Sequence, residues 1–261
     1  MLKQRVTTSI VALAAFMVVL FVVPANVAQF VIAILIIGGA WEWSGFLDSS
    51  SRSSRIIYVV LLAVMISLAG WQLAAGSAYI FQVALVWWLA ALVWAFFFPT
   101  PIPQALRWLC GALVLVPLFV ALIVLYRSDP ALLLFALLIV WAADTGAYFA
   151  GRQFGRVKLA PRISPNKTWE GVIGGLLLVI LLSLAGAAWF DIDRAVLIPF
   201  CLAVACMSIV GDLTVSMFKR SAGLKDSGTL FPGHGGVLDR IDSVAAAAPL
   251  FALGVSWMGL Q

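Results

Sequence analysis

Apolar runs of about 20 residues recur along the whole chain, and a helix of that length crosses the hydrocarbon core of a membrane. Of the 261 residues, 64% are hydrophobic and 10% are charged, and the mean hydropathy is +1.12. A soluble globular domain carries fewer apolar and many more charged residues. The composition therefore excludes an ordinary soluble protein and predicts an all-α, polytopic integral membrane protein.

About nine transmembrane helices are expected. The first run follows Lys3 and Arg5 and resembles a signal peptide, but it lacks a clean small-residue cleavage site and further spans follow it. An uncleaved first span is therefore expected, and the last span begins with charged residues. The nine spans are placed at residues 6–23, 27–47, 56–75, 78–98, 107–126, 130–150, 168–189, 195–217 and 239–258.

Lysine and arginine alternate between the two sides of these spans. With the N-terminus inside, all of the 16 cations except Arg127 and Arg194 fall in cytoplasmic segments, as the positive-inside rule requires. The bias predicts a cytoplasmic N-terminus and a multi-pass protein of the cytoplasmic (inner) membrane. It also accounts for most of the formal net charge of +5, so no nucleic-acid partner is expected.

The two halves of the chain differ in where charge occurs. Residues 1–127 are expected to form a scaffold of hydrophobic helices that also offers a dimerisation surface. Its one acid within an expected span, Glu42, stands between Trp41 and Trp43 and is interpreted as an interfacial acid in an aromatic belt. Residues 128–261 are expected to form the catalytic region, with cytoplasmic loops at 151–167 and 218–238.

The segment 216–242 gathers cations, acids and the only histidine into an otherwise apolar sequence. Charges at membrane depth are costly and mark a functional site by default. Asp212 and Ser216 are one helical turn apart, and Asp239 and Asp242 share a face of the next helix. His234 is equally compatible with a hydrogen-bonded turn residue and a catalytic one. The catalytic candidates here are Lys219, Arg220, Lys225, Asp226, His234, Arg240 and Asp242.

A second group of polar residues precedes the seventh span. Asp144, late in the sixth span, is a candidate site residue, although a proton relay or a helix-packing acid would also explain it. The following loop is compatible with a topogenic basic loop on anionic headgroups, with an anion site at a helix N-terminus and with simple helix capping. The substrate-binding candidates are Asp144, Ser164, Asn166, Lys167, Thr168 and Ser216.

The acids suit a hard cation. Asp212, Asp239 and Asp242 offer oxygen ligands without a neighbouring cysteine, which favours Mg²⁺ bound together with substrate phosphates over zinc. The three cysteines lie in apolar runs without CxxC spacing and are interpreted as small hydrophobic residues. Cations, carboxylates and glycines in one segment point to phosphoryl or nucleotidyl transfer, which needs mainly positioning and charge stabilisation.

The ordered pattern of this segment resembles the signature of the phosphatidate cytidylyltransferase (CDP-diacylglycerol synthase) family. It reads Ser216-x-x-Lys219-Arg220-x4-Lys225-Asp226, then Pro232-Gly233-His234-Gly235-Gly236-Val237-x-Asp239-Arg240-Ile241-Asp242. The upstream stretches 164–171 and 211–212 are also similar to the family's, so the resemblance covers about residues 141–243.

The resemblance implies transfer of CMP from CTP to phosphatidate, with CDP-diacylglycerol and pyrophosphate as products. It places a Mg²⁺ site on Asp212 and Asp239, assisted by K⁺ in at least some members, and implies membrane lipids as partners and a homodimer. Within it, Lys225 and Arg240 are expected to stabilise pyrophosphate, and Lys167 to contact CTP. Lys219 and Arg220 are expected near the phosphatidate headgroup.

Two other functions remain open at this point. A CTP-dependent polyprenol or phytol kinase would use a similar site but would release CDP and a lipid monophosphate. An organic-anion transporter would use the basic mouth to capture its substrate and would release no pyrophosphate.

Overall fold

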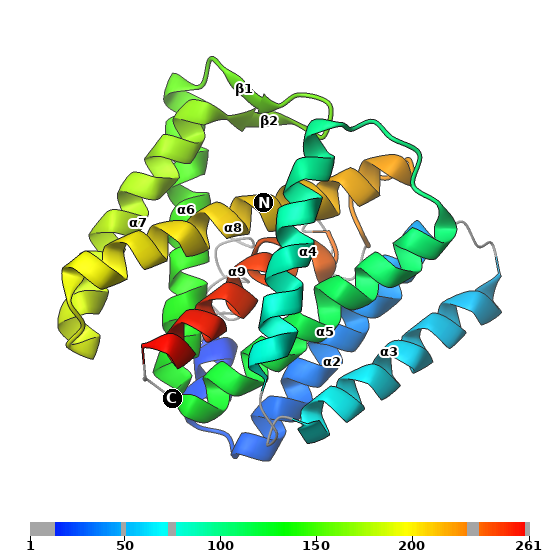
Figure 1. The fold of residues 1–261 in the computed structure, drawn as a ribbon, viewed down its shortest axis with the longest axis horizontal. Coiled ribbons are helices and arrows are strands. Elements are labelled where there is room, and N and C mark those ends of the chain that lie inside the picture. Colours follow the sequence, from blue (N-terminus) through cyan, green and yellow to red (C-terminus); the bar gives the residue numbers. More distant parts are fainter. Residues whose placement is uncertain (1–13, 48–50, 73–76, 229–234, 259–261) are drawn as a thin grey trace.

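The computed structural model describes residues 14–47, 51–72, 77–228 and 235–258, and nearly all of them are helical (Figure 1). Residues 14–21 are helical. The elements that follow are α2 (Ala25–Trp43), the 3-10 turn η1 (Ser44–Phe46), α3 (Arg52–Gln72), α4 (Ala78–Phe96), α5 (Gln104–Ser128), α6 (Pro130–Phe154), β1 (Lys158–Ala160), β2 (Ser164–Thr168), α7 (Trp169–Phe190), α8 (Arg194–Ser221) and α9 (Leu238–Trp257).

Seven helices of the described chain, α2 to α8, are long and apolar enough to cross a membrane. They coincide with seven of the expected spans, which confirms the all-α polytopic class. Of the first expected span, 6–23, the structure describes residues 14–23, and residues 14–21 are helical. The ninth is present as α9, but three charged residues in its first two turns, Asp239, Arg240 and Asp242, shorten its apolar stretch.

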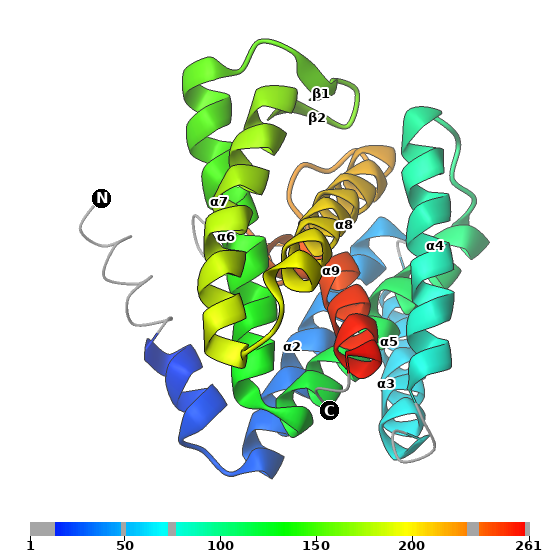
Figure 2. The same cartoon turned by 60° about the vertical axis from the view of Figure 1, so that its left-hand side comes forward.

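Helix α9 lies at the centre of the molecule. In Figure 2, α8 and α9 run between the α6–α7 pair on one side and α3, α4 and α5 on the other. Four consecutive small residues of α9, Ala245–Ala248, are almost completely buried. Such small side chains let neighbouring helices pack closely around α9, which fixes where its charged N-terminal turn emerges.

Helices α6 and α7 also pack at short range through small residues. A Cβ atom added at Gly146 would lie 2.5 Å from the carbonyl oxygen of Gly174 and 2.9 Å from the Cα of Gly175. The backbones are therefore too close for any larger side chain at Gly146. This close pair positions Asp144 and the start of α7 relative to each other.

The segment between α6 and α7 departs from the expected loop. Helix α6 continues to Phe154, and β1 and β2 then form an antiparallel pair with Lys158 opposite Thr168. The Trp169 amide donates to the Val157 carbonyl at 2.9 Å, and the Glu170 carboxylate accepts from the Val157 amide at 3.1 Å. These bonds tie the hairpin to the first turn of α7.

The cationic ends of the helices meet at one end of the molecule. Arg107, at the start of α5, donates to the Phe46 carbonyl at 2.7 Å and to the Ser221 carbonyl at 3.3 Å. Arg220 of α8 donates to Ile163 in the hairpin at 3.2 Å. The ends of α2 and α8, the start of α5 and the hairpin are thus neighbours, as the alternation of lysine and arginine predicts.

Candidate active site

A buried lysine joins α8 to α9. Lys219, in the last turn of α8, donates to Asp239 Oδ1 at 2.9 Å and lies 3.5 Å from Asp242 Oδ2. Lys219 and Asp242 are each only 7% exposed. Buried charges are tolerated when they are paired and hydrogen-bonded, so these contacts hold the two helix ends in one arrangement.

Asp239 is held by the backbone at Ser227 and Gly236, on the two sides of residues 228–235. Its carboxylate accepts from the Ser227 amide at 3.0 Å and from the Gly236 amide at 2.9 Å. Gly235 has a φ of +80°, and a Cβ atom there would lie 2.7 Å from Asp239 Oδ2. A glycine is needed at this position both for its left-handed backbone and for its close approach to the carboxylate.

Asp212 connects this group to the hairpin. Its carboxylate accepts from the Ser216 hydroxyl at 3.1 Å and forms an ion pair with Lys167 of β2. It lies close enough to Lys219, Asp242 and Asp144 for their charges to interact. We call the resulting group, contributed by α6, β2, α8 and α9, the charged cluster: Asp144, Lys167, Asp212, Lys219, Asp239 and Asp242.

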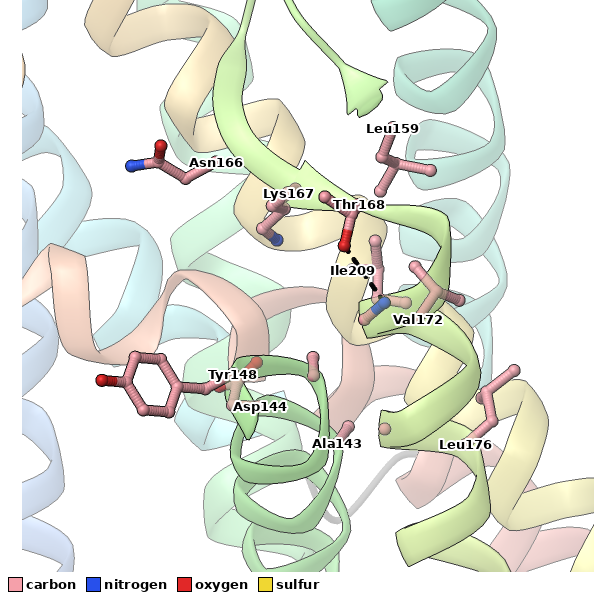
Figure 3. Close-up of a pocket in the computed structure, with 13 residues that line it drawn as sticks. Ala143, Asp144, Tyr148, Leu159, Asn166, Lys167, Thr168, Val172, Leu176 and Ile209 are labelled. Carbon is pink, nitrogen blue, oxygen red and sulfur yellow. Dashed lines mark hydrogen bonds between the residues drawn. The ribbon is translucent and has the colours of Figure 1, made fainter. Parts of the chain in front are cut away.

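A cavity of about 220 Å³ opens beside the charged cluster, between α6, α7 and β2 (Figure 3). Asp144, Asn166, Lys167 and Thr168 line its polar part. In Figure 3 the side chains of Tyr148 and Asn166 extend to the same side, away from Thr168. The cavity thus has one wall that carries a lysine and an acid, and an opposite wall of apolar and small residues from α7.

Thr168 caps α7. Its Oγ1 accepts from the Gly171 amide at 3.2 Å, the bond drawn as a dashed line in Figure 3. Of the three interpretations of this loop, the structure directly displays capping. It leaves the Lys167 side chain at the cavity, where an anion could bind.

A larger, mostly apolar cavity of about 480 Å³ adjoins the first one. It lies between α4, α7, α8 and the hairpin, and it shares Leu159, Val172 and Ile209 with the smaller cavity. Among the described residues that line it, Arg162 is the one that carries a charge. An apolar chamber thus adjoins the polar cavity beside the charged cluster.

The remaining candidates lie outside the charged cluster. Arg220 donates to the carbonyls of Ile163 and Leu224, each at 3.2 Å, and so links α8 to the hairpin. Lys225, Asp226 and Arg240 are exposed, Asn166 is exposed and Ser164 is half-buried. His234 lies outside the described residues.

Glu42 was missed as a site residue. Instead of lying at an interface, its side chain is buried, with 6% exposed, and it accepts hydrogen bonds from Ser227, Val237 and Leu238. The interpretation as an interfacial acid is therefore wrong. The available signal was the occurrence of an acid within an apolar span, which is a functional-site indication in its own right.

The acids of the charged cluster fit a cation that needs few protein ligands. In the part of the chain that the structure describes, no three Asp, Glu, His or Cys side chains are grouped as a metal site. Asp212 lies near Asp242 of α9, however, and each of the two also contacts a lysine. Mg²⁺ commonly uses one or two carboxylates and completes its shell with water and substrate phosphates, so this donor set fits Mg²⁺.

The fold and the charged cluster define a polytopic α-helical membrane protein with a charged site at one end of its helices. Residues 3–258 match the model of the Cytidylyltransferase family. The match covers nearly the whole chain, and the chain belongs to this family.

Several relatives share most of their length with this chain. A phosphatidate cytidylyltransferase of Pseudomonas aeruginosa is 40% identical over 97% of this chain and 96% of its own. The enzyme of the same name from Haemophilus influenzae is 38% identical, with 97% of this chain and 98% of its own covered. That from Thermotoga maritima is 34% identical, with 95% and 94% covered.

Proposed function

We propose that this protein is a phosphatidate cytidylyltransferase, which transfers CMP from CTP to phosphatidate and forms CDP-diacylglycerol and pyrophosphate. Membership of the Cytidylyltransferase family and full-length relatives of that name support the proposal. The observation that carries it is the charged cluster, in which Lys167 and Lys219 face carboxylates from α8 and α9. Lysines that pair with acids in this state can pair with phosphates when substrate binds.

In this reaction a phosphate oxygen of phosphatidate attacks the α-phosphorus of CTP. A new P–O bond forms while the bond to the oxygen bridging the α- and β-phosphorus breaks, and that electron pair leaves with pyrophosphate. The attacking oxygen is already an anion, so it needs no general base. The site therefore has to orient the two phosphates and offset their repulsion.

The lysines of the charged cluster are assigned to the substrates by their position. Lys167 borders the smaller cavity and is proposed to bind the CTP phosphates. Lys219 is buried between Asp239 and Asp242, so we place it at the transferring phosphate, closer to the reaction than the headgroup position expected from sequence. Lys225 and Arg240, both exposed, are proposed to stabilise the departing pyrophosphate.

Mg²⁺ is proposed to be held by Asp212 and Asp239, with a monovalent ion such as K⁺ as a second ion. When bound, the divalent ion neutralises phosphate charge that would otherwise repel the attacking oxygen. Asp239 is held ready by the amides of Ser227 and Gly236. Ser216 donates to Asp212 and so orients that carboxylate.

The larger apolar cavity is proposed to receive an acyl chain of the lipid. It is continuous in its lining with the cavity beside Lys167, because Leu159, Val172 and Ile209 border both. The phosphate of a phosphatidate bound beside the CTP phosphates at Lys167 would then connect directly to a chain among Phe96, Trp169 and Leu213. The clustered cationic ends of the helices favour an active site on the cytoplasmic face of the inner membrane. A homodimer is proposed by analogy with the family.

Pyrophosphate release from purified protein tests the proposal. CTP, phosphatidate and Mg²⁺ together should yield pyrophosphate and CDP-diacylglycerol in equal amounts. CDP with a lipid monophosphate would indicate a lipid kinase, and movement of an organic anion across sealed vesicles without pyrophosphate would indicate a transporter.

A further inference from the structure

The carboxylate of Glu42 occupies a specific place beside the start of α9. Its Oε1 accepts from the Val237 amide at 2.9 Å, and its Oε2 accepts from the Leu238 amide at 2.8 Å and from the Ser227 hydroxyl at 2.9 Å. Three donors to one buried carboxylate form a strong, well-directed interaction. All three come from a part of the sequence more than 180 positions away, with separations of 185 to 196 residues.

Glu42 supplies the cap that α9 lacks. Val237, the residue at the N-cap position, makes no side-chain capping bond, so the first amides of α9 need another acceptor. Glu42 of α2 provides it, and its negative charge also lies at the positive end of the helix dipole. The start of α9 is therefore positioned by a residue of the N-terminal half.

The same carboxylate joins the two ends of the segment 228–236. Ser227 precedes this segment and Val237 follows it, and Glu42 contacts both. A Cβ atom at Gly228 would lie 2.5 Å from Glu42 Oε1, and one at Gly236 would overlap the carboxylate as well. Glycine at positions 228 and 236 thus leaves room for the Glu42 carboxylate.

Asp239 also accepts hydrogen bonds from both sides of residues 228–235, on the side of the charged cluster. The Ser227 amide and the Gly236 amide donate to Asp239, while the Ser227 hydroxyl donates to Glu42. Ser227 therefore bridges the two carboxylates. None of these hydrogen bonds joins Glu42 to Lys219. Glu42 instead holds Ser227 and the start of α9, and these set the position of Asp239.

The end of α2 that carries Glu42 is itself firmly held. Trp43 is fully buried, donates from Nε1 to the Arg107 carbonyl at 2.9 Å, and packs against Phe218 of α8 with 5.0 Å between ring centroids. Arg107 in turn donates to Phe46 and Ser221. A carboxylate mounted on such a support can hold a neighbouring segment in a narrow range of positions.

We propose that Glu42 is a positioning residue of the active site. Through Ser227 and the start of α9, it holds Asp239 and Lys219 in the arrangement that the transfer reaction needs. This inference rests on the proposed function. It adds to that function a residue outside the signature segment, on a helix of the N-terminal half.

The test uses Glu42→Gln in the purified full-length protein. Gln keeps the shape but has one acceptor oxygen, so its NH₂ group would face one of the α9 amides. We expect kcat for pyrophosphate release to fall about 10- to 100-fold, the loss typical when an outer partner of a metal-binding residue is removed. The KM for phosphatidate should change little, and the Mg²⁺ concentration for half-maximal activity should rise.

Asp193→Asn is the matched control, because Asp193 also caps a helix by accepting from a backbone amide, that of Ala195 at 2.8 Å. Asp193→Asn keeps an acceptor oxygen at an exposed cap and should lose little stability and no kcat, whereas Glu42→Gln should lose kcat. Ser227→Ala, which removes one of the three bonds, should lose activity by a smaller factor. In the double variant the losses should be less than multiplicative. A wild-type kcat in folded Glu42→Gln, or losses that multiply, would overturn the proposal.

Amide hydrogen exchange separates this inference from the proposed function, because it needs no activity. Exchange at Val237 and Leu238 should speed up in Glu42→Gln and stay unchanged in Asp193→Asn. Unchanged exchange of the Val237 and Leu238 amides in Glu42→Gln would overturn the proposal that Glu42 holds the start of α9. If the wild-type protein released no pyrophosphate while exchange in Glu42→Gln changed as expected, the proposed function would fail. The positioning of the start of α9 by Glu42 would still stand.

Discussion

Lys219, near the end of α8, donates a 2.9 Å hydrogen bond to Asp239, in the first turn of α9. The bond connects two residues that lie 20 positions apart in sequence and that belong to the two halves of the signature pattern. The lysine is buried between Asp239 and Asp242, so the structure explains the spacing between the lysine and these acids in the signature. This spacing brings a cation from one helix to the acids of the next.

Asp239→Asn should abolish turnover while the protein stays inserted and folded. The substitution removes one of the two proposed Mg²⁺ ligands and the partner of Lys219, but its remaining oxygen can still accept from the Gly236 amide. We expect kcat to fall by at least about 100-fold, since ligands and their immediate partners carry losses of this order. Pyrophosphate release at several Mg²⁺ concentrations measures the effect. Wild-type turnover of the variant at low Mg²⁺ would count against the assignment.

Lys167→Ala should raise the KM for CTP more than it lowers kcat. The side chain pairs with Asp212 and borders the smaller cavity, so its loss should weaken nucleotide binding first. Lys158→Ala is the matched control, because Lys158 is an exposed lysine of the same hairpin and lies opposite Thr168. An unchanged KM for CTP in Lys167→Ala would assign this loop to membrane topology alone.

The spans and their alternation could be predicted from sequence because hydropathy and charge act locally. Runs of apolar residues mark α2 to α8, and the lysines and arginines mark which ends lie together. The proximity of Asp212 to Asp242 of α9 agrees with the faces expected from helical spacing. The spans and the helix faces depend on neighbours within a few turns of the chain.

The hairpin and the role of Glu42 could not be predicted in the same way. Strand β2 contains Pro165 and shows no alternation of apolar and polar residues, so nothing in its pattern favoured a strand. Glu42 acquires its partners only when α2 packs beside the start of α9. Flanking tryptophans are compatible with both an interfacial acid and a buried one.

Thr168→Ala should destabilise the protein by about 1 kcal/mol, the usual cost of removing a helix N-cap. Its Oγ1 accepts from the Gly171 amide, and Thr168→Ser should retain this bond and most of the stability. Thermal unfolding in detergent compares the two variants with wild type. Equal stability of the alanine variant and wild type would contradict the capping role and favour direct substrate binding.

Arg107→Ala should destabilise the protein by about 3 kcal/mol or more, because it leaves the buried carbonyls of Phe46 and Ile102 and the partly buried carbonyl of Ser221 without this donor. All three bonds are present in the structure, at 2.7 to 3.3 Å. Arg127→Ala is the control: it removes one exposed bond to Gln29 and should cost less than about 0.5 kcal/mol. Similar yields and unfolding temperatures for both variants would contradict this account of how the cationic ends are joined.

The most direct measurement is the product balance of the purified wild-type protein with CTP, phosphatidate and Mg²⁺, run beside Asp212→Asn. Acids of α8 and α9 that act together on a nucleoside triphosphate predict one pyrophosphate for each CDP-diacylglycerol formed in wild type. Turnover should be lost when Mg²⁺ is chelated and in Asp212→Asn. Full turnover in Asp212→Asn, or consumption of CTP with CDP as the product, would contradict the account.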